Sequence, residues 1–350
     1  MEDGAEAALK GGDKLETRKR IGVLTGGGDC PGLNAAIRAV TKYSIQLGYE
    51  VIGFLDGLTG LMEGRYRHLD YVMTSGIIDK GGTILGTSGV APQQVEARST
   101  DVFRNVEMLG LQAVVIIGGN TTLSIASRLS GMGLPVVGIP KTIDNDVKET
   151  DYTIGFQTAV QIATDALDRL RSTAESHNRV MILEVMGRDT GWIATCAGMA
   201  NGADAILIPE VPVDIQELCK MLRGRYESGK RFSIVVVAEG TSLPVETTGG
   251  CGRPEAVSKT LERIIQERTG LESRTTLLGH VQRGGTPVAY DRSLATSLGV
   301  KAVRLVEEGK QGHMAALKGN QIVSVPLERL AEGIKTVDLG LYHNAEIFFG

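Results

Sequence analysis

The sequence predicts an α/β protein with mostly parallel sheets. Short runs of β-branched and other apolar residues recur along the chain, each ending in Gly, Asp or Pro, and segments of helical periodicity lie between them. The 350 residues also include 46 glycines, nearly twice the average share, and these cluster after the apolar runs. Strands and helices that alternate through tight glycine turns are typical of sheets covered by helices on both faces.

Several apolar runs are predicted to be strands, because each is almost continuously apolar, as expected for parallel strands that are covered on both faces. They are IGVLT (21–25), VIGF (51–54), AVVIIGG (113–119), PVVGIP (135–140), VMILEV (180–185), AILIPE (205–210) and SIVVVAEG (233–240). A helix is predicted at 34–46, after a Pro-Gly turn, and two more at 156–174 and 254–268, where apolar residues recur at three- and four-residue spacing. Residues 247–256 (TTGGCGRPEA) are predicted to form a long flexible loop.

The composition argues against several classes of partner. The net charge of -4 gives no reason to expect nucleic acid or an anionic membrane. Residues 1–18 are polar and are expected to form a flexible N-terminal tail, and no apolar run approaches the length of a membrane span. The cysteines, Cys30, Cys196, Cys219 and Cys251, form no CxxC pair, so a reduced, cytoplasmic location is expected. A chain of this length is expected to divide into two lobes.

Two glycine turns follow predicted strands. In LTGGGDCPGLNAAIRAV (24–40), three glycines would let the backbone approach a phosphate, although such a turn also serves packing alone. In VVIIGGNTT (114–122), the first polar side chain after the glycines is Asn120, an amide where magnesium would prefer a carboxylate. In a doubly wound sheet, both turns would lie on the same edge.

Three further stretches contain residues that could take part in catalysis or bind phosphate. PKTIDNDV (140–147) places Asp144 and Asp146 two residues apart, so one carboxylate could accept a proton while the other holds geometry or a metal. An ordinary Asp/Asn turn is an equal alternative for this stretch. MGRDTGW (186–192) sets an arginine at a strand end, and LLGHVQRGGTPVAYDR (277–292) combines His280 and Arg283 around a Gly-Gly turn, with Arg274 upstream. Arginine forks suit phosphate oxygens.

Together these stretches resemble the phosphofructokinase family. TGGGDCPGLNAAIR, GGTILGTS, IGGNTT, PKTIDND, MGRDTGW, AEGT and LGHVQRGGTPVAYDR occur in the family's order and spacing, from about Ile21 to about Asp338. The resemblance implies the phosphofructokinase-type fold, with two Rossmann-like lobes and the active site in the cleft between them. It implies a larger, donor-binding lobe of residues 19–157 plus 282–332, and a smaller, sugar-phosphate-binding lobe of residues 158–281 plus 333–350.

On the acceptor side, the chain is similar to the family throughout. The resemblance makes Asp144 the general base for the sugar 1-hydroxyl, with Thr142 and Arg188 as further catalytic residues. The residues implied to contact fructose 6-phosphate are Thr142, Asp144, Asp146, Arg179, Met186, Gly187, Arg188, Glu239, Arg274, His280 and Arg283. In the family, the residues matched by Arg179 and Arg274 usually reach across from a neighbouring subunit, which implies a homo-oligomer, a dimer or tetramer.

On the donor side, the chain departs from the family. The implied donor-binding residues are Gly27, Gly28, Gly89, Gly119, Asn120, Thr121, Thr122 and Lys141, with Asn120 and Asp146 as ligands of Mg²⁺. Asn120 stands where the family has Asp or Glu, and Thr121 where ATP users have Gly and pyrophosphate users have Asp. Gly89 replaces an arginine that bridges donor and acceptor phosphates, and Leu58 replaces an aromatic residue that some ATP users place against adenine.

The resemblance implies a glycolytic 6-phosphofructokinase-type kinase that converts fructose 6-phosphate to fructose 1,6-bisphosphate with Mg²⁺. ATP is the expected donor because Thr121 lacks the pyrophosphate-type carboxylate, and pyrophosphate is the alternative. The changes at Gly89 and Asn120 also leave open a catalytically weak, sugar-phosphate-binding regulatory paralogue, since a bridging arginine contributes strongly to phosphoryl transfer. A third hypothesis is a kinase with another acceptor, such as a seven-carbon sugar phosphate or a nucleoside.

Overall fold

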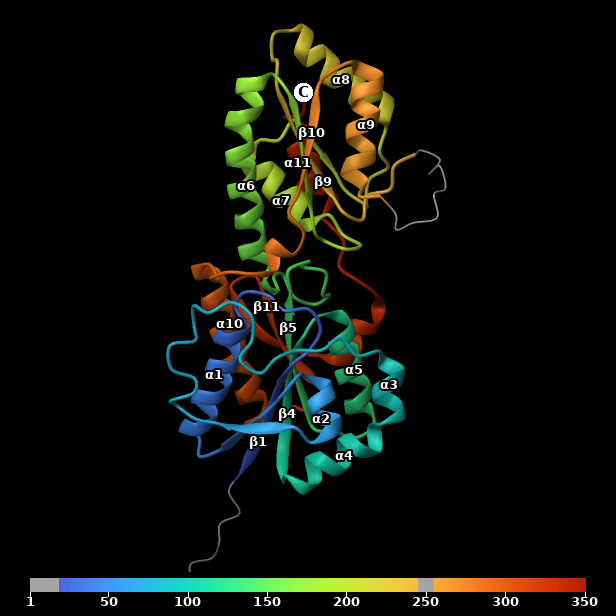
Figure 1. The fold of residues 1–350 in the computed structure, drawn as a ribbon. Helices are drawn as coiled ribbons and strands as arrows, with labels where there is room; N and C mark the ends of the chain where they lie inside the picture. The colour runs from blue at the N-terminus through green and yellow to red at the C-terminus, as the bar shows by residue number, and fades with distance from the viewer. Residues whose placement is uncertain (1–18, 245–254) are drawn as a thin grey trace, which may run out of the picture.

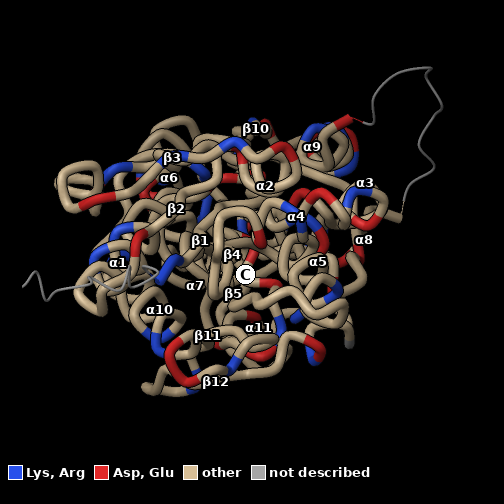
Figure 2. The backbone as a smooth tube through the Cα atoms, turned by 90° about the horizontal axis from the view of Figure 1, so that it is seen from below, with Lys and Arg blue, Asp and Glu red and all other residues tan. Residues whose placement is uncertain are grey.

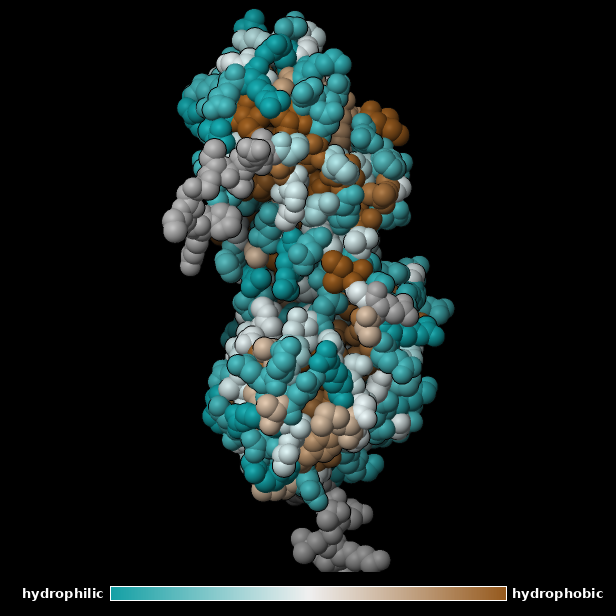
Figure 3. Space-filling model, turned by 90° about the vertical axis from the view of Figure 1, so that its right-hand side faces the viewer, coloured by the Kyte–Doolittle hydropathy of each residue, from teal (hydrophilic) through white to brown (hydrophobic). Residues whose placement is uncertain are grey.

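The computed structural model describes residues 19–244 and 255–350. The predicted tail at 1–18, most of the predicted loop at 247–256, and Cys251 therefore lie outside the described residues. The described chain forms two α/β lobes that are stacked end to end, each built on its own sheet (Figure 1). In the space-filling view the two lobes meet at a narrower waist (Figure 3).

The larger sheet contains eight strands. They are β1 (Arg20–Thr25), β2 (Glu50–Phe54), β3 (Tyr66–Leu69), β4 (Leu111–Gly118), β5 (Val136–Thr142), β6 (Ile154–Gly155), β11 (His313–Lys318) and β12 (Gln321–Pro326). The strand order is β12-β11-β5-β4-β1-β2-β3, with β6 paired to β5. All pairs are parallel except β2/β3 and β11/β12, which form the two edges.

The smaller sheet contains four parallel strands in the order β10-β7-β9-β8. They are β7 (Val180–Val185), β8 (Ala205–Leu207), β9 (Ser233–Ala238) and β10 (Ser273–Leu277). The strands of the larger sheet fall within 19–157 and 282–332, and those of the smaller sheet within 158–281. The lobe boundaries and the division of binding between the lobes stay a prediction.

Helices cover both faces of each sheet (Figure 1). On the larger sheet, one face carries α1 (Leu33–Gln46) and α10 (Ala289–Glu307), and the other carries α2 (Leu58–Glu63), α3 (Pro92–Ala97), α4 (Ser99–Met108) and α5 (Asn120–Gly131). On the smaller sheet, one face carries α6 (Phe156–His177), α7 (Trp192–Asn201) and α11 (Leu339–Glu346), and the other carries α8 (Ile215–Glu227) and α9 (Val257–Thr269). Two 3-10 helices, η1 (Gly279–Arg283) and η2 (Leu327–Glu332), lie in the connections.

One hydrophobic core runs through both lobes. It joins the α1 and α10 side of the larger sheet to the α6 and α7 side of the smaller one, through residues that include Ile154 and Phe156. Both side chains are fully buried. Because packed interiors resist deformation, this shared core holds the strand ends of the two sheets in a defined relation.

The predicted α/β class is confirmed, with differences at individual elements. The run AILIPE forms a strand only over β8, and α9 begins at Val257. The strands β3, β6, β10, β11 and β12 were not predicted, and two of them, β3 and β10, consist largely of polar or exposed residues such as those of SRTTL. Cys30, Cys196 and Cys219 are free thiols.

Charged side chains of both signs lie on the outer helices and loops, around a centre of uncharged strands (Figure 2). This distribution follows from the strand sequences, which are almost entirely apolar in β1, β4 and β9. Within residues 19–244 and 255–350, no helix is both long enough and apolar enough to cross a membrane.

Candidate active site

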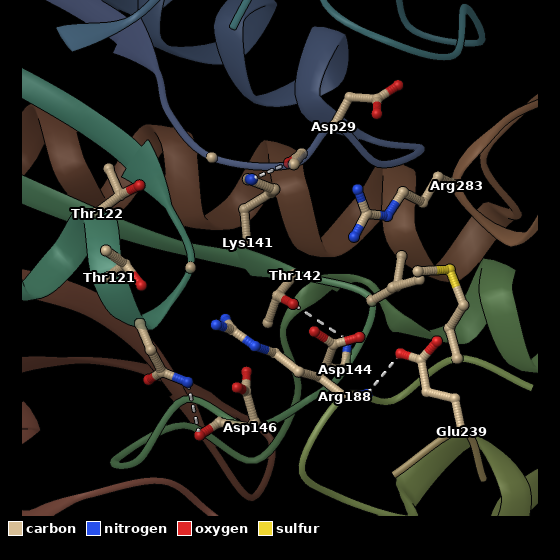
Figure 4. Close-up of a pocket in the computed structure, with 16 residues that line it drawn as sticks. Asp29, Thr121, Thr122, Lys141, Thr142, Asp144, Asp146, Arg188, Glu239 and Arg283 are labelled. Carbon is tan, nitrogen blue, oxygen red and sulfur yellow. Dashed lines mark hydrogen bonds between the residues drawn. The ribbon is translucent and has the colours of Figure 1, made fainter. Parts of the chain in front are cut away.

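A pocket of about 320 Å³ lies between the two lobes, where strand ends of both sheets face each other (Figure 4). Turns after β1, β4 and β5 contribute from the larger sheet, and turns after β7 and β9 contribute from the smaller one. The lining residues are Gly27, Gly28, Asp29, Gly119, Asn120, Thr121, Thr122, Lys141, Thr142, Ile143, Asp144, Asp146, Met186, Arg188, Glu239 and Arg283. The carboxyl ends of parallel strands are where α/β sheets bind ligands.

The two glycine turns lie side by side at this edge. The Gly26 N–H donates to the Ile117 carbonyl at 2.9 Å, which joins the turn after β1 to the end of β4. A Cβ atom at Gly26 would lie 2.7 Å from the Thr122 Cγ2, and one at Gly118 would lie 2.4 Å from it, so neither position has room for a side chain. The first residues of α5 line the pocket. The free N–H groups and the positive dipole end of a helix start favour an anion at such a place.

The buried side chain of Lys141 is hydrogen-bonded to the backbone of the first glycine turn. Its side chain is only 2% exposed, and its Nζ donates to the Gly26 carbonyl at 2.9 Å and to the Gly28 carbonyl. Burial lowers the pKa of this ammonium group. Because both carbonyls turn toward Lys141, the ammonium group determines how the backbone of this turn is presented to the pocket.

Asp144 lies at the centre of the pocket (Figure 4). Its backbone N–H donates to the Thr142 Oγ1 at 3.1 Å, whereas its buried Oδ1 has no hydrogen-bond partner in the described chain. The pKa of this carboxyl is raised to about 6, mainly by burial and then by the nearby charge of Asp146, while Arg283 opposes the shift. A buried oxygen without a partner is uncommon in folded proteins and is expected where a ligand completes the site.

The turn between the two carboxylates is held by Asn145. Its φ of 51° lies in the left-handed region, which asparagine tolerates better than most residues. The Asn145 Oδ1 accepts from the Thr153 N–H at 3.1 Å, and its Nδ2 donates to the Asp151 carbonyl at 3.3 Å. Asp144 and Asp146 thus project from a loop whose shape is tied to residues farther along the chain.

Asp146 and Asn120 contact each other at one side of the pocket. The Asn120 Nδ2 donates to the backbone carbonyl of Asp146 at 3.1 Å (Figure 4). Burial raises the pKa of the Asp146 carboxyl, and hydrogen bonding from Asn120 opposes this shift. In the described chain, no group of three His, Cys, Asp or Glu side chains could hold a metal. The Asp146 carboxylate and the Asn120 amide oxygen nevertheless suit Mg²⁺, which binds one or two carboxylates and takes its other ligands from phosphate and water.

Arg188 and Glu239 come from the smaller lobe. Arg188 has a φ of 55°, an uncommon conformation for a residue other than glycine, and its N–H donates to the Glu239 Oε1 at 2.9 Å. Its exposed side chain extends across the pocket toward Thr142 and Asp146 (Figure 4). The Thr190 Oγ1 donates to the Asp144 carbonyl at 3.2 Å, so this loop also contacts the carboxylate loop directly.

Arg283 reaches the pocket from the end of η1. A Cβ atom at Gly28 would lie 2.9 Å from the Arg283 Nη1, so the guanidinium lies directly against the glycine turn. It also lowers the pKa of both Asp144 and Lys141 through its charge. In the part of the chain that the structure describes, no hydrogen bond or ion pair engages this guanidinium, which leaves its donors available to a ligand.

The structure brings most of the predicted site residues together, but not all of them. Five do not line the pocket: Gly89, Arg179, Gly187, Arg274 and His280. Arg179 and Arg274 instead share Glu272 on the surface of the smaller lobe, at 2.7 and 2.5 Å. Gly187 is a neighbour of lining residues, and Leu58 is 2% exposed in the core.

Two lining residues were not predicted, Asp29 and Ile143. Asp29 directly follows the three glycines of the first turn, so its position in TGGGD was an available signal. Ile143 lies between Thr142 and Asp144, and an isolated apolar residue in a polar motif gives no comparable signal.

Comparisons with known proteins agree on one family. The phosphofructokinase family model matches residues 20–306. ATP-dependent 6-phosphofructokinase 3 of Streptomyces coelicolor is 51% identical over 93% of this chain and 99% of its own length. A pyrophosphate–fructose 6-phosphate 1-phosphotransferase of the same organism is 48% identical over 95% and 100%. The T-state crystal structure of Pichia pastoris phosphofructokinase matches with a TM-score of 0.83 and 36% sequence identity. The match covers 91% of this chain and 36% of the longer Pichia chain.

Proposed function

Because this chain belongs to the phosphofructokinase family, we propose that it transfers a phosphoryl group to the 1-hydroxyl of fructose 6-phosphate, giving fructose 1,6-bisphosphate. The proposal rests above all on Asp144, whose unpartnered, buried Oδ1 lies in a pocket shared by both sheets. An acceptor hydroxyl placed there would supply the hydrogen bond that this oxygen lacks.

Asp144 acts as the general base in this proposal. The 1-hydroxyl oxygen attacks the terminal phosphorus of the donor, Asp144 takes the hydroxyl proton, and the bond from phosphorus to the leaving phosphate oxygen breaks. A pKa of about 6 keeps the Asp144 carboxyl mostly ionised at neutral pH. It also leaves the carboxylate more basic than an ordinary aspartate, which favours proton transfer.

Three cations line the pocket in which we place the transferred group: Lys141, Arg188 and Arg283. Phosphoryl transfer depends mainly on alignment and on neutralising the charge of the moving group. Bound Mg²⁺ would supply further charge neutralisation, with Asp146 and Asn120 as the protein residues that hold it. We propose that these cations together compensate for the glycine at position 89.

ATP is the proposed donor. The neutral Thr121 hydroxyl lies at the start of α5, where a carboxylate would repel the phosphates of a nucleotide. Pyrophosphate is the second candidate, because relatives named for either donor are about equally similar, at 51% and 48% identity.

We further propose that the larger lobe binds the donor and the smaller lobe binds the sugar phosphate. Arg179 and Arg274 lie outside the pocket of their own chain, which agrees with a role in the pocket of a neighbouring subunit. Apolar side chains gather on one face of the smaller lobe (Figure 3), as protein contact surfaces often show. A homo-oligomer, a cytoplasmic location and the lack of nucleic-acid or membrane partners remain predictions.

A coupled assay tests the proposal. Fructose 6-phosphate is supplied with ATP, with other nucleotides or with pyrophosphate, each with and without Mg²⁺. We expect Mg²⁺-dependent turnover with ATP, and a loss of about 1000-fold or more in Asp144→Asn because the general base is gone. Consumption of neither ATP nor pyrophosphate by the unaltered protein would rule out the proposed activity.

A double variant distinguishes the proposed kinase from the alternative, a catalytically weak regulatory paralogue. A Cβ atom at Gly89 would have no atom within 4 Å, so a side chain can begin there without a clash. Gly89→Arg combined with Asn120→Asp should raise activity sharply if the donor site is defective. We expect little gain or a loss, because Asn120 already donates to the Asp146 carbonyl and an aspartate at this position lacks that donor.

A further inference from the structure

Lys335 belongs to none of the motifs that predicted the site, yet it contacts the loop that carries Asp144 and Asp146. It lies between η2 and α11, in the segment that crosses from the larger lobe to the smaller one (red in Figure 1). Such a crossing segment needs only to connect two lobes. Lys335 does more than connect them, because it forms hydrogen bonds to a pocket loop of each lobe.

On one side, Lys335 holds the carboxylate loop at two places. Its backbone N–H donates to the Asp146 carbonyl at 2.7 Å. Its Nζ donates to the Thr150 and Asp151 carbonyls, both at 2.8 Å. The Asp146 carbonyl also accepts from the Asn120 side chain, so this peptide group is bound from α5 and from the crossing segment at the same time.

On the other side, Lys335 contacts the start of α7 in the smaller lobe. The Trp192 Nε1 donates to the Lys335 carbonyl at 3.1 Å, and the Lys335 Nζ lies 5.2 Å from the centroid of the Trp192 ring. A cation over an aromatic face at this distance is attractive. Trp192 closely follows Arg188, so the residue that Lys335 contacts belongs to the same motif as the arginine in the pocket.

The same segment continues this connection two residues later. The Val337 N–H donates to the Glu210 Oε1 at 3.0 Å, and the Glu210 carboxylate also accepts from the Gly191 N–H at 3.0 Å from its Oε2. The stretch from Lys335 to Val337 is therefore hydrogen-bonded to both sides of the pocket, with Lys335 supplying the link to the Asp144 loop.

We infer that Lys335 is a positioning residue, which sets the Asp144 loop of the larger lobe relative to the Arg188 loop of the smaller lobe. The inference rests on the proposed function, in which these two loops must align base, acceptor and phosphoryl group. A displacement of about 1 Å in such an arrangement can lower a rate about 100-fold. Lys335 touches no substrate in this scheme and acts through the two loops.

Lys335→Met tests the inference, because methionine keeps an unbranched apolar stem and loses the ammonium group. We expect kcat to fall by about 10- to 100-fold with less than about threefold change in the KM for fructose 6-phosphate, since alignment is affected more than binding. Lys335→Arg should recover part of the lost kcat because it retains the cation. Lys310→Met is the matched control, as Lys310 forms an exposed ion pair with Glu308 on the protein surface.

Two readouts do not depend on activity. Trp192 is the only tryptophan in the sequence, so tryptophan emission reports directly on its contact with Lys335. We expect the emission to change in Lys335→Met and to stay constant in Lys310→Met. Hydrogen exchange of the peptide that covers 143–152 should become faster in Lys335→Met only, because two loop carbonyls lose their donor.

If Lys335→Met does not fold, Trp192→Phe decides the question, since it removes the N–H donated to the Lys335 carbonyl, together with part of the indole, and keeps an aromatic ring at this position. A kcat reduced about threefold or more with normal circular dichroism supports the inference. Unchanged kcat and unchanged exchange at 143–152 in a folded variant would overturn it. An inactive unaltered protein would instead reject the proposed function, and the exchange measurement would still judge the role of Lys335.

Discussion

Asp144→Asn should make the protein more stable at neutral pH while abolishing its activity. The fold holds the Asp144 carboxylate in a largely buried position, where its Oδ1 has no hydrogen-bond partner among the described residues. Its pKa is raised from 3.8 to about 6, mainly because burial disfavours the charged form. Asparagine has nearly the same shape and carries no charge at any pH.

The magnitude follows from the pKa. A shift of roughly two units corresponds to about 3 kcal/mol of folding free energy, because each unit is about 1.4 kcal/mol. The folded state binds the proton more tightly than the unfolded state, so stability falls as pH rises from about 4 to about 6, and the full penalty is present above that range. Relief by asparagine should therefore be about 3 kcal/mol at pH 7.5 and about half that at pH 5.

Thermal unfolding measures this difference. An unfolding entropy of about 2 cal/mol/K per residue makes 3 kcal/mol equal to a rise of about 4 °C in Tm for a chain of this length. Scans of both proteins at pH 5 and pH 7.5, followed by circular dichroism, should show the larger gain at pH 7.5. A lower Tm for Asp144→Asn at pH 7.5, or a gain that does not depend on pH, would refute the electrostatic argument.

Asp291→Asn is the matched control, since Asp291 is also buried but has hydrogen-bond partners. Its carboxylate accepts from the Gly155 N–H at 3.0 Å, from the Thr158 N–H at 2.8 Å and from the Thr158 hydroxyl. Burial raises the pKa of this carboxyl too, and these hydrogen bonds oppose the shift. An amide group there would leave at least one buried donor unsatisfied, so we expect a loss of about 1–3 kcal/mol.

Three further predictions concern activity. The kcat/KM for fructose 6-phosphate should fall about tenfold per pH unit below pH 6, because protonation of Asp144 removes the base; a pH-rate profile that stays flat down to pH 5 would contradict this. Lys141→Met should raise the donor KM about tenfold or more, because the Gly26 and Gly28 carbonyls lose their donor and the backbone of this turn shifts; donor titrations measure this. Asn120→Asp alone should lower kcat/KM about 3- to 10-fold through loss of its bond to the Asp146 carbonyl, measured in the coupled assay against the unaltered protein.

Much of the pocket could be predicted because its residues lie in short local motifs at strand ends. The glycine turn after β1 and the turn at Asn120 were expected on one edge of a sheet, and the Gly26 N–H indeed donates to the Ile117 carbonyl. The two-residue spacing after a strand made Asp144 and Asp146 candidates, with an ordinary turn as an equal alternative, and the resemblance to the family favoured the functional interpretation. Such features can be recognised in the sequence because strand periodicity and turn chemistry involve neighbours along the chain.

The strand β10 was not predicted because its sequence is not continuously apolar. It is held by its pairing with β7, a long-range contact that no local pattern indicates. Arg283 was assigned to the acceptor phosphate by resemblance alone. Its guanidinium lies against Gly28 of the donor-side turn, which no local pattern indicates. The functional meaning of that contact stays a prediction.

By itself, the sequence determined the α/β class, the glycine turns and the carboxylate pair, because these depend on residue types a few positions apart. Only the tertiary structure decided the environment of Asp144, whose pKa of about 6 comes from burial and from charges brought in by other segments. It alone also showed that Lys335, almost 190 residues after Asp146, donates to the carbonyl of that aspartate. Burial and long-range hydrogen bonds arise when distant segments pack, and they leave no local pattern in the chain.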